Sequence, residues 1–277
     1  MEIQTKKYTV DDIQLHVAEV GIGQPLVFIH GWSNSWVGWT LLAKELAPYY
    51  KLYMIDLPGF GDSSRLPEYS LEIVSSYVSS FINTYVGSSP KAIIGASSGT
   101  FVAVHVATTN NFSSSVILIG AVLRRKRLVW VKKLYEKLLT FSSNYSFAQK
   151  TFEHIIKHRY SAYFIEKYLN AYRFNKKRID LYQMPGRKKV IGKSYVQLGV
   201  SIMQYFLDRE LQGIQQNTLL IVGSADKYTP VSTATAFLKK TGNKKISLRA
   251  IPECGHSPAY EQPVITAQII RDYLAAS

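Results

Sequence analysis

Cysteine is almost absent from the sequence, which has only Cys254 among its 277 residues. A single thiol forms no disulfide within the chain, so the fold does not depend on an oxidising compartment. Residues 1–7 lack the apolar core of a secretory signal peptide. The long uncharged stretch of residues 92–123 is interrupted by Gly, Ser, Asn and His, which argues against a membrane span. We therefore expect a cytoplasmic protein without a membrane anchor.

Acidic residues are scarce in only one part of the chain. Residues 122–217 carry 20 Lys and Arg against 6 Asp and Glu, whereas the rest of the chain carries 13 of each kind. The whole net charge of +14 therefore belongs to this middle segment. Its basic residues are concentrated at residues 124–127, 176–178 and 187–189. The pattern is typical of a neutral body that carries a cationic insertion.

Internal repeats and low-complexity tracts are also missing, which excludes a solenoid. Hydrophobic residues make up 47% of the chain and charged residues 19%. This balance supplies enough apolar surface for one substantial core and argues against disorder. A length of 277 residues favours one large domain with an insertion over two independent units.

Short apolar runs alternate with helical stretches at both ends of the chain. Two β-rich segments, residues 6–10 and 13–20, flank Asp11-Asp12 and predict an antiparallel hairpin. Continuous apolar runs that are separated by helices are typical of a parallel sheet covered on both faces, so the fold class is α/β. The remaining strands are predicted at residues 26–29, 52–55, 92–94, 116–119, 218–222 and 246–250, and the helices at 36–47, 70–85, 98–108, 232–240 and 264–275.

The alternation stops between residues 123 and 213, where Lys, Arg, Tyr and Phe recur with helical spacing and no strand run is evident. Nine of the 19 tyrosines lie there, which predicts an amphipathic surface. We expect residues 1–121 and 218–277 to be the two parts of one α/β core. Residues 122–217 are then a helical, basic insertion.

The most specific local motif is Gly95-Ala96-Ser97-Ser98-Gly99, between a predicted strand and a predicted helix. A G-x-S-x-G sequence in that context is typical of a nucleophile elbow, a tight turn that exposes the central serine in a strained conformation. Ser97 is therefore the candidate nucleophile. Because Gly-Ser clusters also form ordinary turns, a base and an acid elsewhere in the chain are needed to support this interpretation.

A serine hydroxyl attacks only when a base removes its proton, and the base in turn is oriented by a carboxylate. Asp226 follows one late strand and His256 follows the next. Ser97 likewise follows its strand, so all three side chains are expected at the same edge of the sheet. Glu253 precedes the histidine too closely to reach around it, and Cys254 is expected to pack as a small residue.

The tetrahedral intermediate needs backbone N–H donors for its oxyanion. One is expected from Ser98, directly after the nucleophile, and the other from Trp32, in the loop after an early strand. The same two amides are the expected contacts to the substrate's carbonyl oxygen. His30 is expected to support this loop structurally and not to take part in the chemistry.

Taken together, these segments resemble the α/β-hydrolase superfamily over nearly the whole chain. The resemblance implies a mostly parallel eight-stranded sheet with flanking helices and a helical lid inserted after the sixth strand, as well as the order Ser, Asp, His of the catalytic residues. The matching stretches are His30-Gly31-Trp32, residues 56–63, 95–99 and 223–226 with Thr229-Pro230, residues 255–258 and residues 261–263.

Within this superfamily, Ser97 excludes the haloalkane dehalogenases and epoxide hydrolases, which need an aspartate at the elbow, whereas cofactor-free haloperoxidases and perhydrolases share the triad. The pairing of His30-Gly31-Trp32 with residues 56–61 and a basic lid is similar to the pimeloyl-acyl-carrier methyl ester esterases. The resemblance implies a serine carboxylesterase that uses Ser97, His256 and Asp226 and needs no metal or organic cofactor. A slow or single-turnover small-molecule receptor, and a C–C bond or thioester hydrolase, stay open.

The basic lid has three interpretations. The first is a solvated face without a partner. The second is a surface for an acidic protein such as an acyl carrier protein, and the third is a surface for an anionic membrane that delivers lipid esters. Nucleic acid is not expected as a partner, because the charge lies on a hydrolase lid and no nucleic-acid module accompanies it.

Overall fold

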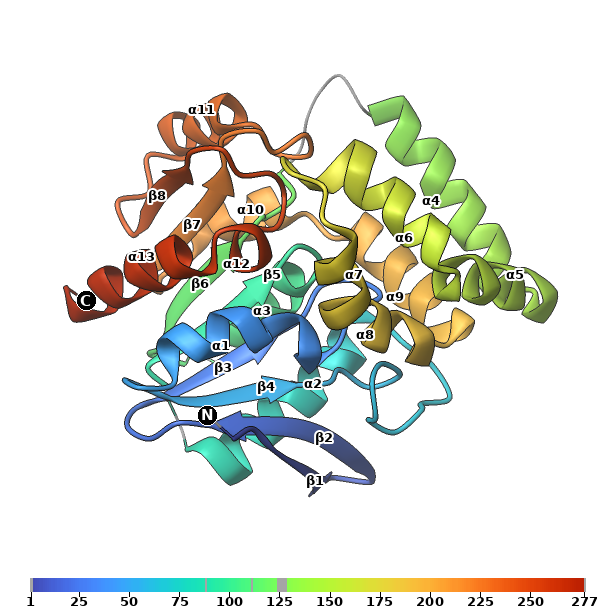
Figure 1. Ribbon diagram of the computed structural model, residues 1–277, viewed down its shortest axis with the longest axis horizontal. Coiled ribbons are helices and arrows are strands. Elements are labelled where there is room, and N and C mark those ends of the chain that lie inside the picture. Colours follow the sequence, from blue (N-terminus) through green and yellow to red (C-terminus); the bar gives the residue numbers. More distant parts are fainter. Residues whose placement is uncertain (1, 88, 111, 124–128, 277) are drawn as a thin grey trace.

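The structure is a computed structural model that describes residues 2–87, 89–110, 112–123 and 129–276 (Figure 1). It contains an eight-stranded sheet in the order β1-β2-β4-β3-β5-β6-β7-β8. The basic cluster at residues 124–127 lies outside the described residues. The strands are β1 (Gln4–Val10), β2 (Ile13–Val20), β3 (Pro25–Ile29), β4 (Lys51–Ile55), β5 (Ala92–Ala96), β6 (Ser115–Ile119), β7 (Thr218–Gly223) and β8 (Ile246–Ile251).

Only the first two strands depart from the parallel arrangement. β1 and β2 form the expected hairpin, with Val10 opposite Ile13, and β2 pairs antiparallel with β4. The turn between them places Asp11 at a φ of +51°, a left-handed conformation that aspartate tolerates better than most residues. From β4 to β8 every neighbouring pair is parallel, so the carboxyl ends of these strands meet at one edge.

Helices bury both faces of the sheet (Figure 1). Val27 and Ile29 of β3 belong to one buried cluster, which includes residues of α2 (Leu71–Phe81) and α3 (Gly99–Thr109). Leu26 and Phe28 belong to the opposite cluster, with residues of α1 (Thr40–Leu46) and α13 (Pro263–Ala275). Successive side chains of a strand point to opposite faces of the sheet, and here both sets are buried. This agrees with the prediction from the uninterrupted apolar runs.

Polar residues set several helix boundaries. The Ser70 side chain accepts a hydrogen bond from the Ile73 N–H and begins α2, which continues into a π-helical turn, Ile82–Val86. α11 (Val231–Thr241) ends at Gly242, whose φ is +62°. The helix expected at residues 36–47 begins as a 3-10 turn, Trp36–Trp39, before α1.

The described helices between β6 and β7, which span residues 129–213, form an insertion that lies beside the carboxyl ends of the parallel strands (Figure 1). Among the described residues, no helix is both long enough and apolar enough to cross a membrane. The helices of the insertion are α4 (Val129–Ser143), α5 (Ser146–Lys157), α6 (Arg159–Ile165), the π-helix η4 (Glu166–Asn170), α7 (Lys176–Tyr182), α8 (Met184–Lys189), α9 (Gly192–Gln204) and α10 (Leu207–Gly213).

Candidate active site

Ser97 occupies the turn between β5 and α3, with a φ of +49° that non-glycine residues rarely adopt. Glycine is required on both sides of it. A Cβ at Gly95 would come within 2.5 Å of the Gly99 carbonyl oxygen, and one at Gly99 within 2.3 Å of the Ile29 carbonyl oxygen. The turn therefore has the close packing of a nucleophile elbow, and it places the serine at the carboxyl edge of the sheet.

The three side chains expected to meet at this edge are joined by hydrogen bonds. His256 Nε2 lies 2.9 Å from Ser97 Oγ, and His256 Nδ1 lies 3.0 Å from Asp226 Oδ2. Asp226 and His256 are both buried. A carboxylate that accepts from Nδ1–H leaves the Nε2 lone pair directed at the serine, which is the tautomer that a general base requires.

The other oxygen of Asp226 is also occupied. Oδ1 accepts the backbone N–H groups of Tyr228, at 2.7 Å, and Thr229, at 3.1 Å. Because both donors are backbone groups of the loop after β7, they fix the rotation of the carboxylate and with it the oxygen that faces His256. The Tyr228 ring lies against the imidazole, with 4.5 Å between ring centroids.

The loop expected to supply an oxyanion donor follows β3 and approaches the elbow. An added Cβ at Gly31 would lie 3.2 Å from Ser97 Cβ. The next residue, Trp32, is anchored in the insertion, where its ring stacks on Tyr195 at 4.5 Å and Nε1–H donates to the Tyr195 carbonyl at 3.1 Å. Ser98 immediately precedes α3, and the first N–H groups of a helix have no acceptor within it.

His30 supports this loop, as expected. Its Nε2 accepts the Leu57 N–H at 3.1 Å, which leaves Nδ1–H to donate to the Gly31 carbonyl at 2.8 Å. Burial lowers the pKa of His30, so the ring is held in the neutral form. In this arrangement the imidazole fixes the backbone beside Trp32 and has no direct role at Ser97.

Two neighbours of His256 do not join the hydrogen-bonded chain. Cys254 is fully buried, and burial raises its pKa to about 12, so the thiolate is scarce at neutral pH. Glu253 is exposed and pairs with Arg173. Neither side chain competes with the residues that contact Ser97.

Two further residues hold the histidine loop and had no role predicted from the sequence. The His256 N–H donates to the Asn170 carbonyl of η4 at 2.7 Å, which ties the loop to the insertion. Glu261 Oε1 accepts the N–H groups of Gly255 and Ser257, and its Oε2 accepts that of Tyr172. Burial raises the pKa of Glu261 despite these bonds. Glu261 lies in a stretch that matches the superfamily, whereas a backbone carbonyl such as that of Asn170 leaves no sequence signal.

We expect Glu261→Ala to impair positioning of the histidine. The substitution leaves three backbone N–H groups without their acceptor, each at a cost of about 1–3 kcal/mol where water does not replace it. kcat should fall at least tenfold with KM nearly unchanged, because misplacing a reacting group by about 1 Å can cost about a hundredfold. Glu261→Gln, which keeps one acceptor oxygen, should recover part of the loss.

Glu253→Ala is the matched control, because this glutamate lies in the same loop but is exposed, and its side chain pairs with Arg173. Steady-state kinetics of the three variants test the prediction. An equal loss in Glu253→Ala and Glu261→Ala, or a change confined to KM, would contradict it.

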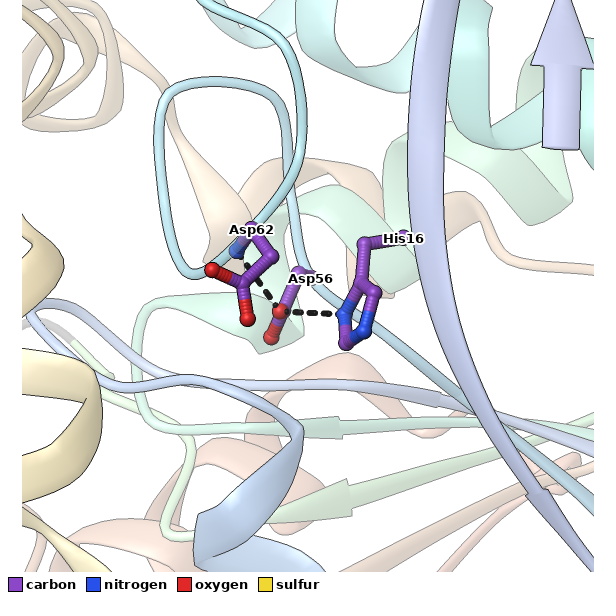
Figure 2. A group of neighbouring side chains, drawn as sticks. All are labelled: His16, Asp56 and Asp62. Carbon is purple, nitrogen blue, oxygen red and sulfur yellow. Dashed lines mark hydrogen bonds and ion pairs between the residues drawn. The ribbon is translucent and has the colours of Figure 1, made fainter. Parts of the chain in front are cut away.

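One histidine and two aspartates cluster between β2 and the loop after β4, with His16 and Asp56 buried and Asp62 exposed (Figure 2). The donor atoms of His16, Asp56 and Asp62 lie within 4.8 Å of one another. They already have protein partners: Asp56 Oδ2 accepts from His16 Nδ1 at 2.8 Å and from the Asp62 N–H at 3.0 Å, while Asp62 pairs with Lys189. We interpret the cluster as a brace that joins β2, the loop after β4 and the insertion.

A large cavity opens above Ser97. It has a volume of about 1210 Å³ and extends between the sheet edge and the insertion. Apolar side chains such as Phe101, Phe152 and Ile202 line much of it, together with Tyr135, Tyr195 and Tyr228. A cavity of this size and composition has room for an organic molecule larger than an acetyl ester.

The family model of the α/β hydrolase fold matches residues 24–263. The chain belongs to this family. It is 26% identical over 257 residues to a pimeloyl-[acyl-carrier protein] methyl ester esterase of Wigglesworthia glossinidia brevipalpis, covering 90% of this chain and 93% of that protein. It is also 24% identical to a 2-hydroxy-6-oxo-6-(2'-aminophenyl)hexa-2,4-dienoic acid hydrolase of Metapseudomonas resinovorans, covering 95% and 88%.

Solved structures agree on the fold of this α/β hydrolase. A thermophilic esterase from Thermogutta terrifontis, with malate bound, superposes with a TM-score of 0.77 at 19% identity and covers 99% of this chain and 98% of its own. A putative lipase from Acinetobacter baumannii reaches a TM-score of 0.79 at 20% identity, covering 99% and 91%. The expected fold class, an eight-stranded mostly parallel sheet with flanking helices, is confirmed.

Proposed function

We propose that the protein is a serine hydrolase of carboxylic esters. The observation that carries the proposal is the hydrogen-bonded chain from Ser97 through His256 to Asp226, with contacts of 2.9 and 3.0 Å, at the base of a large apolar cavity. The family relationship and the esterases among its relatives support a hydrolase.

In the proposed mechanism, Ser97 Oγ attacks the ester carbonyl carbon while His256 Nε2 takes the hydroxyl proton. The carbonyl oxygen becomes an oxyanion, which the N–H groups of Trp32 and Ser98 stabilise. The imidazolium then protonates the leaving alcohol, and an acyl-enzyme is left on Ser97. Water activated by His256 attacks this ester, the carboxylic acid leaves, and Ser97 regains its proton. Asp226 stays ionised throughout and orients the imidazole.

The insertion acts in this proposal as the lid of the active site. Tyr195 anchors Trp32, and the Asn170 carbonyl holds the backbone of His256, so the lid contacts both sides of the reacting centre. Apolar side chains from α5 and α9 line the cavity that contains Ser97. Excluding water there strengthens the hydrogen bonds to the developing oxyanion.

Hydrolysis of p-nitrophenyl esters from acetyl to palmitoyl tests the proposed activity. We expect multiple turnover with an optimum above acetyl, since the cavity volume is about 1210 Å³. Complete absence of turnover over the whole series would favour a receptor of the same fold over an enzyme. A single burst without turnover would mark slow deacylation and would argue for the same conclusion.

We further propose that the outer face of the lid binds an acidic protein that delivers the acyl group. Leu134, Leu138 and Phe141 form an exposed apolar stripe at i, i+4 and i+7 along α4, with the exposed Lys137 beside them. Mixed apolar and basic surface suits an acidic partner with an apolar patch. The 26% identical relative, whose substrate is carried by an acyl carrier protein, supports this choice.

We expect neutralising exposed lid lysines to weaken use of a carrier-bound ester by about tenfold or more in kcat/KM, mainly through association, because attraction of opposite charges accelerates encounter. The variant replaces Lys137, Lys150 and Lys167 by Gln, three lysines that are exposed in the structure and do not line the cavity. Hydrolysis of a free p-nitrophenyl ester by the same variant is the control. Equal effects on both substrates would contradict carrier binding, and loss of binding to anionic vesicles alone would favour a membrane instead.

The cytoplasmic location stays a prediction.

A further inference from the structure

An aromatic ring lies directly against the imidazole of the proposed base. The centroids of the Tyr228 and His256 rings are 4.5 Å apart, and the two planes are inclined by 47°. Both side chains line the cavity, and His256 is buried there. A tyrosine in this position can affect the charge on the imidazole as well as its packing.

The loop after β7 fixes the position of the Tyr228 ring. The Tyr228 N–H donates to Asp226 Oδ1 at 2.7 Å, and the next residue, Thr229, is fully buried and accepts the Leu123 N–H on Oγ1 at 3.0 Å. The backbone at the end of β6 approaches the same imidazole, since a Cβ at Gly120 would lie 3.3 Å from His256 Cε1. These contacts leave the imidazole little room to move away from the ring.

The imidazole changes its charge during ester hydrolysis, because it takes the proton of Ser97 and becomes an imidazolium. A buried cation is costly unless groups of opposite charge or suitable dipoles surround it. Asp226 supplies one such group on the Nδ1 side, at 3.0 Å. The face of an aromatic ring carries partial negative charge and attracts a cation that lies within about 6 Å of its centroid. The Tyr228 ring is inside this distance.

The other titratable groups near the imidazole carry less negative charge than Asp226. Burial raises the pKa of Glu166 on the lid and that of Glu261, which holds the histidine loop. Burial also raises the pKa of the Tyr228 phenol to about 12, so its hydroxyl is neutral at pH 7. The ring therefore acts on the imidazole through its face and carries no full charge. The titratable side chains that surround the imidazole are Ser97, Glu166, Asp226, Tyr228 and Glu261.

We infer that the Tyr228 ring stabilises the imidazolium that forms on His256, through cation–π attraction. The inference rests on the proposed ester hydrolysis and adds a residue that acts through His256. The imidazolium forms twice in each turnover, once when Ser97 attacks the ester and once when water attacks the acyl-enzyme. The ring therefore favours the transition states of both steps over the ground states, in which the imidazole is neutral.

The test compares three replacements of Tyr228 in the full chain. Tyr228→Phe keeps the ring face, Tyr228→Leu removes the ring, and pentafluorophenylalanine at this position keeps the shape of the ring but reverses the charge of its face. We expect the leucine and pentafluorophenylalanine variants to lose about threefold to tenfold in kcat for p-nitrophenyl esters, the range of a cation–π pair. Tyr228→Phe should lose much less, because phenylalanine retains the negative ring face.

The protonation of His256 distinguishes cation–π attraction from simple exclusion of water. Nitrogen NMR of isotope-labelled histidine side chains measures the pH at which half of the imidazole is protonated. This midpoint should lie about half a pH unit to one unit lower in the leucine and pentafluorophenylalanine variants than in the native protein. If the ring only excluded water, leucine would raise the midpoint and pentafluorophenylalanine would leave it unchanged. Either of these results would overturn the inference.

Tyr160→Leu is the matched control, because Tyr160 also lies against a histidine, the exposed His158 of the lid, with 5.4 Å between centroids. It should change neither kcat nor the midpoint of His256, and an equal change there would overturn the inference.

The NMR titration needs no turnover, so it separates this inference from the proposed function. If no ester is turned over but the midpoints shift as expected, the ring interaction stands and the proposed catalysis fails. If esters are turned over but the native and pentafluorophenylalanine proteins titrate together, the inference fails and the catalysis stands.

Discussion

Ser97→Ala should lower kcat for every ester substrate by about 10⁴-fold to 10⁶-fold, the range seen when a serine nucleophile is removed from a triad. The substitution deletes the one oxygen that lies 2.9 Å from His256 Nε2 and leaves no group there that can form an acyl-enzyme. Steady-state hydrolysis of the best p-nitrophenyl ester measures the effect.

The fold should tolerate this change, because alanine keeps the Cβ and the backbone bond from the residue 97 N–H to the Ile119 carbonyl. Ser98→Ala is the matched control at the neighbouring position, since the proposed oxyanion donor there is the backbone N–H. Activity of Ser97→Ala within tenfold of the native value, at an unchanged melting temperature, would rule out Ser97 as the nucleophile.

Asp226→Asn should lower kcat by about 10³-fold to 10⁴-fold, through the tautomer of His256. The N–H groups of Tyr228 and Thr229 require an acceptor at the Oδ1 position, so the asparagine oxygen takes that place and its NH₂ group faces His256 Nδ1. The imidazole must then accept at Nδ1 and carry its proton on Nε2, where it cannot receive the serine proton.

Asp180→Asn is the control for a charge-neutral exchange, because Asp180 accepts from the Tyr163 hydroxyl on the lid and does not contact His256. Rates of both variants, with circular dichroism to compare folding, test the prediction. A loss below about tenfold in Asp226→Asn would mean that this carboxylate does not set the tautomer.

Burial raises the pKa of the Glu166 carboxyl, which lines the cavity, and we therefore expect the stability of the protein to depend on pH. A carboxyl whose pKa is raised on folding stabilises the protein below its unfolded pKa, and that contribution is lost as the pH rises through the folded value. Between pH 4 and pH 8 the melting temperature of the native protein should therefore fall relative to that of Glu166→Gln. A constant difference over this range would contradict the raised pKa.

Most of the core is predictable because its signals are local. The runs at residues 26–29 and 116–119 are apolar without interruption, and both are strands. Such runs are typical of a parallel sheet that is buried on both faces. The Asp11-Asp12 turn likewise predicts the β1–β2 hairpin. The lid is different: Lys, Tyr and Phe recur throughout it with few stop signals, so its division into α4–α10 could not be read from the sequence.

The residues of the candidate site also divide into those that the sequence pattern predicts and those that it does not. Ser97, Asp226 and His256 each follow a strand, so their meeting at one sheet edge follows from topology, and the structure brings them within hydrogen-bonding distance. Glu261 and Asn170 hold the histidine loop through contacts with backbone groups, which leave no local sequence signal. Arg187 lies in a basic segment of the sequence, and nothing in that segment indicates that the side chain is buried.

The central claim is that Ser97 carries the acyl group during turnover. The most direct measurement is rapid acid quenching during hydrolysis of the preferred p-nitrophenyl ester, followed by peptide mass spectrometry, with His256→Ala as a variant that should not accumulate the adduct. The account predicts an added acyl mass on the peptide that contains Ser97, and on Ser97 itself after fragmentation. Turnover with an acyl group on another residue, or with no acyl-enzyme when deacylation is slowed, would contradict it.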